Sequence, residues 1–498
     1  MMNTSWKGCH LFPRNVWSIA THYSTTPEMP ACEYQPKKYM GPGYERVWRI
    51  RSDHLFKNAP PYYKRPLLIH DGYMQWLFDH RGRRYLDMFG GIVTVSVGHC
   101  HPKVVEAAAE QMKSLWHTTN IYLHPKLYEY AEKLTSKLPR KLKVAYFVNS
   151  GSEANDVAML LARLHTGSHD VISFCNAYHG MTLGAMGLTA MCTWKHAVPS
   201  ALGVHHAMNP DVYRGVWGGA RCRDSPVQTE RECACAPGAC EAGDQYYGQL
   251  EELFKYSLPR GRVAGLFAES IQGIGGTVQF PKGFLKKAYE LVKSNGGVYI
   301  ADEVQTGFGR TGEHFWGFEM HGVEPDIVTM AKGMGNGFPM AAVITTPEIA
   351  SKAEQALHFS TFGGNPVASA VGLAVLQVIE EEETQQRSHE VGTHLLRRLA
   401  DLRDRYQCVG DVRGKGLMAG VELVEDRRSR RPLPAKSFVD VWEDCKDMGL
   451  LLGRGGLSGN VFRIKPPMCV TKEDADFTVA VLETAFQKLT EKRERSLP

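Results

Sequence analysis

The sequence lacks any apolar run of the roughly 20 residues needed to cross a lipid bilayer. Its most apolar helix-like stretch, 367–379, is about as long as one buried helix. Strong charge of one sign is also missing, because the net charge is +5 over 498 residues. A nucleic-acid binder would concentrate Lys and Arg on one face. We therefore expect neither a membrane nor a nucleic acid as a partner.

The twelve cysteines lack the regular spacing of a disulfide framework, which a chain of this size does not need. One group is different, since Cys222, Cys233, Cys235 and Cys240 lie within nineteen residues. Four thiols could bind a tetrahedral zinc ion. The Cys-x-Cys spacing is tighter than the usual Cys-x₂-Cys, so free or redox-linked thiols are the alternative. We predict no other metal site.

Acidic residues are absent from the first 27 positions. This segment contains Lys7, Arg14 and many Ser and Thr residues, and no continuous apolar stretch follows Arg14. Such a composition is typical of a mitochondrial transit peptide rather than a secretory signal. We predict a protein of the mitochondrial matrix, with a disordered tail as the alternative interpretation of residues 1–27.

Apolar strand-like segments alternate with amphipathic helices through the middle of the chain. We expect strands at 144–148, 171–174, 263–267, 298–301, 327–330 and 341–344, and helices at 153–164, from Gly180 onward, and at 282–294. This alternation favours an α/β fold with a mostly parallel sheet covered by helices on both faces. Beyond Pro366, long helices at 367–382 and 391–406, strands at 416–423 and 461–464, and a helix at 473–492 indicate a smaller α+β domain.

These patterns predict two domains. Residues 28–95 form an N-terminal arm with short antiparallel strands and belong to the small domain. Residues 96–350 form the large domain, with a Cys-rich insertion at about 210–245. Residues 351–498 complete the small domain.

The segment Val298–Arg310 delivers two acids, Asp302 and Glu303, at the end of a strand and before a glycine-rich loop. In open α/β sheets, ligands bind beyond the carboxyl ends of the strands. Asp302 is therefore a candidate to hold a cationic ligand atom, and a turn cap is the alternative. Asn149–Asn155 joins a strand to a helix through small residues, which suits a phosphate at the helix N-terminus. A plain N-capped helix is the alternative there.

Two further segments follow predicted strands and should reach the same edge of the sheet. Tyr178-His179-Gly180 offers an aromatic ring that could stack on a planar ligand. A lysine is usually a solvated surface residue. Because Lys332 follows an apolar segment, burial could lower its pKa enough to make it a nucleophile. A phosphate cradle, a stacking ring, a strand-end acid and a lysine are the parts that pyridoxal 5′-phosphate requires.

From about residue 40 to the C-terminus the chain resembles a class-III aminotransferase of fold type I, a pyridoxal-phosphate-dependent transferase family. The resemblance is carried by seven motifs in order: Gly98–Pro102, Asn149–Asn155, Tyr178–Gly180, Glu269–Gly273, Ala301–Arg310, Lys332-Gly333 and Thr361–Pro366. It implies that Lys332 forms the aldimine and moves the Cα proton, while Asp302 pairs with the pyridinium nitrogen. The other cofactor-binding residues that it implies are Gly151, Ser152, Tyr178, His179, Glu269, Val304, Gln305 and, from a second subunit, Thr361.

The resemblance also implies a homodimer, with a tetramer left open, that acts on amino acids and 2-oxo acids. Arg463 matches the family arginine that clamps the substrate carboxylate, and Ile92 and Tyr62 are further candidates for substrate binding. Ile274 stands where enzymes for ω-amines carry a glutamate that can pair with this arginine. Ser270 stands where proline is common, and the sequence offers no reason for it.

These features favour a small donor and a ping-pong reaction. We expect transfer from alanine, with β-aminoisobutyrate or methylated arginines as wider options, to glyoxylate or pyruvate. The alternatives are another class-III enzyme, namely an ω-amino acid aminotransferase, a decarboxylase or an aminomutase, and a non-catalytic scaffold that kept the fold.

Overall fold

The computed structural model describes residues 26–58, 61–199, 202–233, 235–236 and 239–495. The predicted transit peptide, 1–27, therefore lies outside the described residues except for its last two positions. Among the described helices, none is both long enough and apolar enough to cross a membrane.

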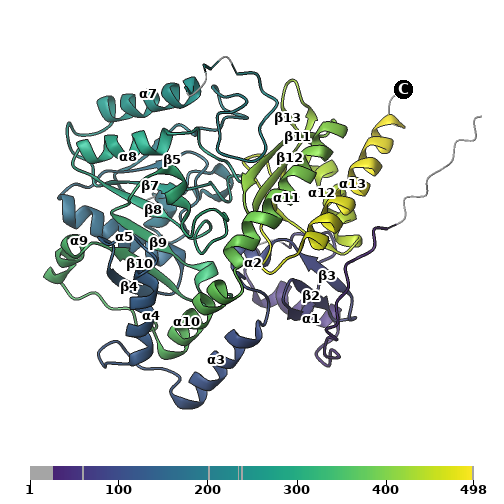
Figure 1. Ribbon diagram of the computed structural model, residues 1–498, viewed down its shortest axis with the longest axis horizontal. Coiled ribbons are helices and arrows are strands. Elements are labelled where there is room, and N and C mark those ends of the chain that lie inside the picture. The colour runs from purple at the N-terminus through teal and green to yellow at the C-terminus, as the bar shows by residue number, and fades with distance from the viewer. Residues whose placement is uncertain (1–25, 59–60, 200–201, 234, 237–238, 496–498) are drawn as a thin grey trace, which may run out of the picture.

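A seven-stranded sheet forms the centre of the larger half of the molecule (Figure 1). Its strand order is β4 (Val144–Val148), β10 (Ala341–Thr345), β9 (Ile327–Met330), β8 (Val298–Asp302), β7 (Gly265–Glu269), β5 (Val171–Phe174) and β6 (Val204–Ala207). The pairs from β9 through β6 are parallel, and β10 runs antiparallel to both of its neighbours. The predicted fold class, a mostly parallel sheet covered by helices, is confirmed.

Alternate residues of the buried strands enter two different cores, since successive side chains point to opposite faces. Val298 and Ile300 pack with α5 (Gly151–Thr166), whereas Tyr299 and Ala301 pack on the face covered by α8 (Phe284–Ser294). Asp302 continues the Val298–Ile300 series and therefore points toward α5. Its neighbour Glu303 points the other way.

Two smaller sheets make up the other half of the molecule. A four-stranded sheet combines β1 (Ile69–Tyr73), β2 (Trp76–Asp79) and β3 (Arg84–Asp87) with β14 (Leu450–Leu451), so the N-terminal strands pair with a C-terminal one. A five-stranded sheet contains β11 (Val409–Lys415), β12 (Met418–Asp426), β13 (Arg431–Pro432), β15 (Gly453–Gly455) and β16 (Val461–Ile464).

The remaining helices cover these sheets or connect them (Figure 1). They are α1 (Tyr44–His54), α2 (Gly90–Val93), α3 (Pro102–Ser114), α4 (Pro125–Thr135), α6 (Ala185–Leu188), α7 (Glu241–Tyr256), α9 (Pro347–Ser351), α10 (Pro366–Glu381), α11 (Thr384–Arg405), α12 (Ala435–Asp447) and α13 (Lys472–Glu494). Short 3₁₀ turns lie at η1 (Cys192–Trp194), η2 (Gly317–His321), η3 (Lys332–Met334) and η4 (Lys352–Gln355). The helix predicted from Gly180 onward is only the short α6, and α7 and α12 were not predicted.

Glu303 is a buried acid that links the loops that follow β7 and β8. It accepts hydrogen bonds from Ser270 Oγ (2.7 Å) and Thr306 Oγ1 (2.8 Å), and from the amides of Gly317 (2.7 Å) and Phe318 (2.8 Å). A buried carboxylate is tolerated only with such partners. This contact explains Ser270, because a proline at that position would have no hydroxyl to donate.

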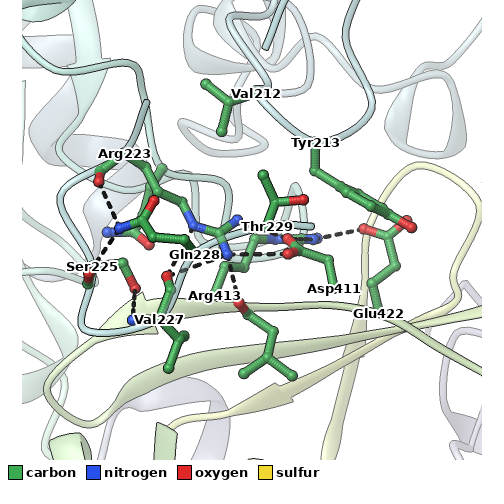
Figure 2. Close-up of polar contacts among 12 residues, drawn as sticks. Val212, Tyr213, Arg223, Ser225, Val227, Gln228, Thr229, Asp411, Arg413 and Glu422 are labelled. Carbon is green, nitrogen blue, oxygen red and sulfur yellow. Dashed lines mark hydrogen bonds and ion pairs between the residues drawn. The ribbon is translucent and has the colours of Figure 1, made fainter. Parts of the chain in front are cut away.

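A buried ionic network ties the Cys-rich insertion to the five-stranded sheet (Figure 2). The guanidinium of Arg223 binds both carboxylate oxygens of Asp411 in β11, at 2.8 and 3.0 Å, and the Val412 carbonyl oxygen at 2.6 Å. Arg413 continues the network, with its Nη1 atom 3.0 Å from Asp411 and 2.7 Å from Glu422. Burial would raise the pKa of Asp411, but the Arg223 guanidinium holds it below its usual range.

Replacing Ser270 with alanine should destabilise the fold, because one oxygen of the buried Glu303 would lose a donor. We expect a loss of about 1–3 kcal/mol, the usual effect of removing a hydrogen bond to a charged buried group. Denaturant-induced unfolding followed by circular dichroism measures it. Ser294→Ala, at an exposed helix end, is the matched control. Equal stability of both variants would contradict a structural role for the Ser270 hydroxyl.

Candidate active site

A cavity of about 280 Å³ opens at the carboxyl ends of the parallel strands, where ligands of open α/β sheets bind. Its lining comes from segments that are far apart in the sequence: Gly91, Ile92, Thr94, Gly151, Ser152, Asn155, Tyr178, His179, Gly180, Trp194, Glu269, Ile274, Asp302, Val304, Gln305 and Lys332. Most of the predicted cofactor-binding residues therefore lie around one space.

The Asp302 carboxylate is buried at the end of β8 and oriented by three neighbours. Its Oδ2 atom lies 2.7 Å from His179 Nδ1 and accepts from Asn155 Nδ2 at 2.9 Å, while Oδ1 accepts from the Val304 amide at 3.1 Å. The hydroxyl of Thr329 donates to Asn155 Oδ1 at 2.8 Å and so turns the amide nitrogen of Asn155 toward the acid. The carboxylate is held rigidly in a dry environment, where its charge acts strongly on a ligand.

Lys332 follows β9 and presents a partly buried amine to the same cavity. Burial lowers its pKa to about 8, with the positive charge of Arg463 as the second cause. Its backbone is left-handed (φ 48°), a conformation that costs a non-glycine residue roughly 1–2 kcal/mol. The Ser96 hydroxyl donates to the next carbonyl, that of Gly333, at 2.6 Å and helps to hold this turn. An amine with such a pKa is partly neutral near pH 7 and can act as a nucleophile or a base.

The N-terminus of α5 forms one wall of the cavity. The Ser150 side chain caps the helix by accepting from the amide of Glu153, and the first helical residues, Gly151 and Ser152, line the cavity. Their amides have no partner inside the helix and carry its positive dipole end. Gly180 has φ 127°, and a Cβ atom there would lie 2.5 Å from Ser152 Oγ. Glycine at position 180 therefore leaves space beside Ser152 for an anion such as phosphate.

Glu269, at the end of β7, positions the segment that carries Tyr178. Its carboxylate accepts from the amide of Tyr178 at 3.1 Å and from that of Gly273 at 2.7 Å. Burial raises its pKa. The ring of Tyr178 meets Trp194 edge-on, with the ring centroids 5.0 Å apart. Both aromatic rings line the cavity.

Arg463 lies behind the cavity and reaches it through Gln305. Its Nη2 atom donates to Gln305 Oε1 at 3.3 Å, and its buried Nε atom has no hydrogen-bond partner among the residues that the structure describes. Lys465, two residues further along, donates to the same Gln305 oxygen at 3.2 Å. Burial and Arg463 lower the pKa of Lys465 well below its ordinary value. A buried guanidinium with an unused donor is suited to receive a carboxylate.

The turn α2 forms the rim of the cavity with an unusual backbone. Gly90, Gly91, Ile92 and Val93 all have positive φ values, between 55° and 65°. Asp87 anchors the turn, because its Oδ1 atom accepts from the amides of Phe89 and Gly90, both at 2.9 Å. Left-handed conformations are costly for β-branched residues and often occur at functional sites. Ile92 is 41% exposed and is placed at the opening.

Three of the predicted site residues do not line the cavity of the single chain. Arg463 touches it only through Gln305. Tyr62 is 46% exposed and packs against the ring of Trp442, with the centroids 5.0 Å apart. Thr361 is exposed in a segment next to Asn149, whose amide lies 3.5 Å from Ser360 Oγ.

Sequence reasoning missed several residues of the site: Thr94, Asn155, Trp194 and the buried Lys465. Asn155 was inside the quoted motif, one turn along the helix from Gly151, and its spacing could have placed it on the same face. Lys465 is two residues after Arg463, a spacing that places both side chains on the same face of an extended segment. Nothing local to Trp194 indicates its place, because tertiary packing brings it to the cavity.

The chain belongs to the class-III aminotransferase family, since the family model described as "Aminotransferase class-III" matches residues 59–486. Among curated relatives, it is 56% identical over 480 residues to human mitochondrial alanine–glyoxylate aminotransferase 2, covering 96% of this chain and 93% of that one.

Two solved structures show the same arrangement. One is a phospholyase from Arthrobacter in complex with phosphoethanolamine, 32% identical, with a TM-score of 0.79 and coverage of 91% of this chain and 100% of that one. The other is an amine transaminase from an uncultivated Pseudomonas species in its pyridoxal-phosphate-bound form, 31% identical, with a TM-score of 0.78 and coverage of 86% and 96%. The family resemblance seen in the sequence is confirmed.

The lowered pKa of Lys332 predicts how its reactivity depends on pH. With a pKa of about 8, about a tenth of the amine is neutral at pH 7 and half at pH 8. Acetylation of Lys332 in the ligand-free chain should therefore rise about tenfold between pH 6 and 7 and level off above pH 9. Competitive labelling with mass spectrometry measures it against the exposed Lys286. A Lys332 rate that is still rising above pH 10 would contradict the assigned pKa.

Proposed function

We propose that this chain is a pyridoxal-phosphate-dependent aminotransferase that moves the amino group of alanine to glyoxylate or pyruvate in a ping-pong reaction. One observation carries the proposal: a partly buried amine with a pKa of about 8, Lys332, and a buried, oriented carboxylate, Asp302, line one cavity beside a helix N-terminus. The 56% identity to alanine–glyoxylate aminotransferase 2 supports the choice of substrates.

The cavity fits the cofactor by the chemistry of its lining. The N-terminus of α5 would hold the phosphate, and Tyr178 and Val304 would enclose the ring. Asp302 would hold the proton on the ring nitrogen. His179 and Asn155 already contact its carboxylate and orient it. Gln305 would reach the phenolic oxygen, and Glu269 holds Tyr178 in place. When bound, the cofactor supplies an electron sink for the carbanion at the substrate Cα.

Lys332 is the residue that we propose moves the proton. Burial and the charge of Arg463 lower the pKa of its amine, so a neutral fraction can take a proton from the substrate Cα at neutral pH. The resulting ammonium would be stabilised by the negative charges of Asp302 and Glu269, both of which act to raise its pKa. The same amine can return the proton in the second half-reaction, which needs no further residue.

Arg463 is the residue that we propose binds the substrate carboxylate. A Cβ atom on Gly455 would lie 2.3 Å from Arg463 Cδ and 2.8 Å from the Ile274 carbonyl oxygen, so the Ile274 backbone passes close to the arginine. The side chain there is apolar and cannot pair with the guanidinium. Arg463 therefore stays available to the carboxylate in both half-reactions, which favours a small α-amino acid such as alanine. Ile92 at the rim would limit the length of the substrate, with Tyr62 further out.

A second copy of the chain would complete the site, and the surface supports such a homodimer. Large apolar side chains are exposed in two segments, 115–123 and 357–362, which meet where the rings of His117 and Phe362 lie 5.6 Å apart. Exposed apolar patches of this kind mark interaction sites. Asn149 and Glu153, at the start of α5, line the adjoining hollow. A partner seated there would bring its Thr361 to the phosphate end of the cavity.

The relatives named mitochondrial support a mitochondrial location, and we propose the matrix as the compartment. β-Aminoisobutyrate and methylated arginines are further proposed donors. The phospholyase among the structural relatives shows that this scaffold also supports elimination, so the reaction must be tested and not only the fold.

Alanine given to the purified holoenzyme without an acceptor should release about one pyruvate per site and no carbon dioxide or ammonia, because the amino group stays on the enzyme. Adding glyoxylate should then permit continuous turnover. Lys332→Ala should lower turnover at least about a thousandfold, since it removes the proton carrier. Lys286→Ala, at an exposed lysine, is the control. Release of carbon dioxide or ammonia in place of pyruvate, or full activity of the Lys332 variant, would refute the proposal.

Introducing a glutamate at position 274 should change the substrate preference. Ile274→Glu would place a carboxylate next to Arg463, and we expect kcat/KM for alanine to fall about 10- to 100-fold, the effect of a charged hydrogen bond worth about 1.5–3 kcal/mol. The preference for γ-aminobutyrate relative to alanine should rise. Ile274→Gln has the same shape without the charge and should change the ratio only a fewfold. Equal ratios in the two variants would rule out pairing with Arg463.

A further inference from the structure

Four cysteines outside the catalytic cavity come together in the fold. The sulfur atoms of Cys222, Cys233 and Cys235 all lie within 4.8 Å of one another, and Cys240 borders the same surface hollow as these three. All four are free thiols. They come from separate places in the chain: Cys222 in one loop, Cys233 and Cys235 further along, and Cys240 directly before α7. They line one wall of a surface hollow of about 790 Å³.

The spacing of these sulfur atoms matches the ligands of one ion rather than a covalent link. Zinc–sulfur bonds are about 2.3 Å long, so two ligands of a tetrahedral zinc lie about 3.8 Å apart. The Cys222 and Cys233 sulfur atoms are 3.9 Å apart. A disulfide would need about 2.05 Å. The tight Cys-x-Cys spacing still permits a shared ion, because the sulfur atoms of Cys233 and Cys235 are within the same 4.8 Å.

The surroundings suit a centre of negative charge. A backbone amide donates to one of the sulfur atoms, from Glu241 to Cys235 at 3.4 Å. Cys240 is the N-cap of α7, where the helix dipole favours a thiolate. Four thiolates on Zn²⁺ leave two negative charges. Arg221 and Lys282 line the same hollow, as does Lys287, which pairs with Asp244 there.

We propose that Cys222, Cys233, Cys235 and Cys240 bind one structural Zn²⁺ ion that cross-links the Cys-rich insertion, from the loop of Cys222 to the start of α7. All four ligands come from the protein, which is the pattern of a closed structural site with no position for substrate. This proposal is independent of the catalytic one.

The position of Cys222 shows what the ion would stabilise. Its carbonyl accepts from the Lys282 amide at 2.7 Å, just before α8, and the next residue, Arg223, forms the buried pair with Asp411 shown in Figure 2. The ion would therefore hold the loop that delivers Arg223 to β11. Arg413, in the same network, donates to the Gly276 carbonyl at 2.9 Å, two residues from Ile274 in the cavity wall. The ion would fix the outer end of this chain of contacts.

The test uses the full-length holoenzyme, expressed with added zinc and then dialysed against EDTA. The zinc content per chain is measured by elemental mass spectrometry. We expect about one zinc per chain. Cys235→Ser should lose most of this zinc on dialysis, whereas Cys235→His, which keeps a ligand, should retain it. Cys192→Ser, an exposed cysteine outside the cluster, is the matched control. Thermal unfolding should begin at a lower temperature in Cys235→Ser but not in Cys235→His.

Cobalt offers a second measurement that does not depend on the stability of a variant. Co²⁺ exchanged into the unaltered protein should give the intense visible absorption of a tetrahedral thiolate site. The proposal would be overturned if the purified protein contained no zinc and the four cluster thiols could all be alkylated. A disulfide between any two of the four cysteines would also overturn it. So would zinc that stays equally bound in Cys235→Ser and in the unaltered protein.

Discussion

The buried carboxylate of Asp302 is the constraint on which the arrangement of the site depends. A charge in a dry environment is tolerated only where donors surround it. Here the donors come from α5, from the segment after β5 and from the backbone after β8, so satisfying one carboxylate fixes three elements relative to one another. Thr329 in β9 adds a fourth through Asn155. The same contacts that make the acid acceptable in the interior also aim it at the cavity.

Three basic side chains, those of Lys332, Arg463 and Lys465, lie close enough together to lower the pKa of both lysines, and this unfavourable arrangement serves the proposed function. Arg463 and Lys465 share the single oxygen Gln305 Oε1, and Arg463 helps to lower the pKa of Lys332. Glu269 is a nearby negative charge that partly offsets them. A site with excess positive charge and an unused arginine donor would be relieved by anionic ligands, namely a phosphate and a carboxylate. That requirement suits a phosphorylated cofactor and a substrate with a carboxylate.

Much of the fold could be predicted because apolar periodicity is a local signal. The strands at 144–148, 171–174 and 327–330 have the predicted bounds, since each is an apolar run that ends in turn residues. The helices α7 and α12 were not predicted, although both are amphipathic. The bounds of β7 differ by two residues, because pairing with β8 and not local sequence decides where it ends.

The sequence by itself determined the family, the strands of the central sheet and the identity of the chemical groups, because apolar runs and motifs such as those around Lys332 and Asp302 are local. Only the tertiary structure decided what each group contacts. Ser270 had no explanation until it was found to donate to Glu303, and Lys465 and Trp194 joined the site only through packing. The four sulfur atoms could be counted in the sequence, but their distances could not. Contacts between distant segments depend on the balance of burial and hydrogen bonding over the whole chain, which no short pattern contains.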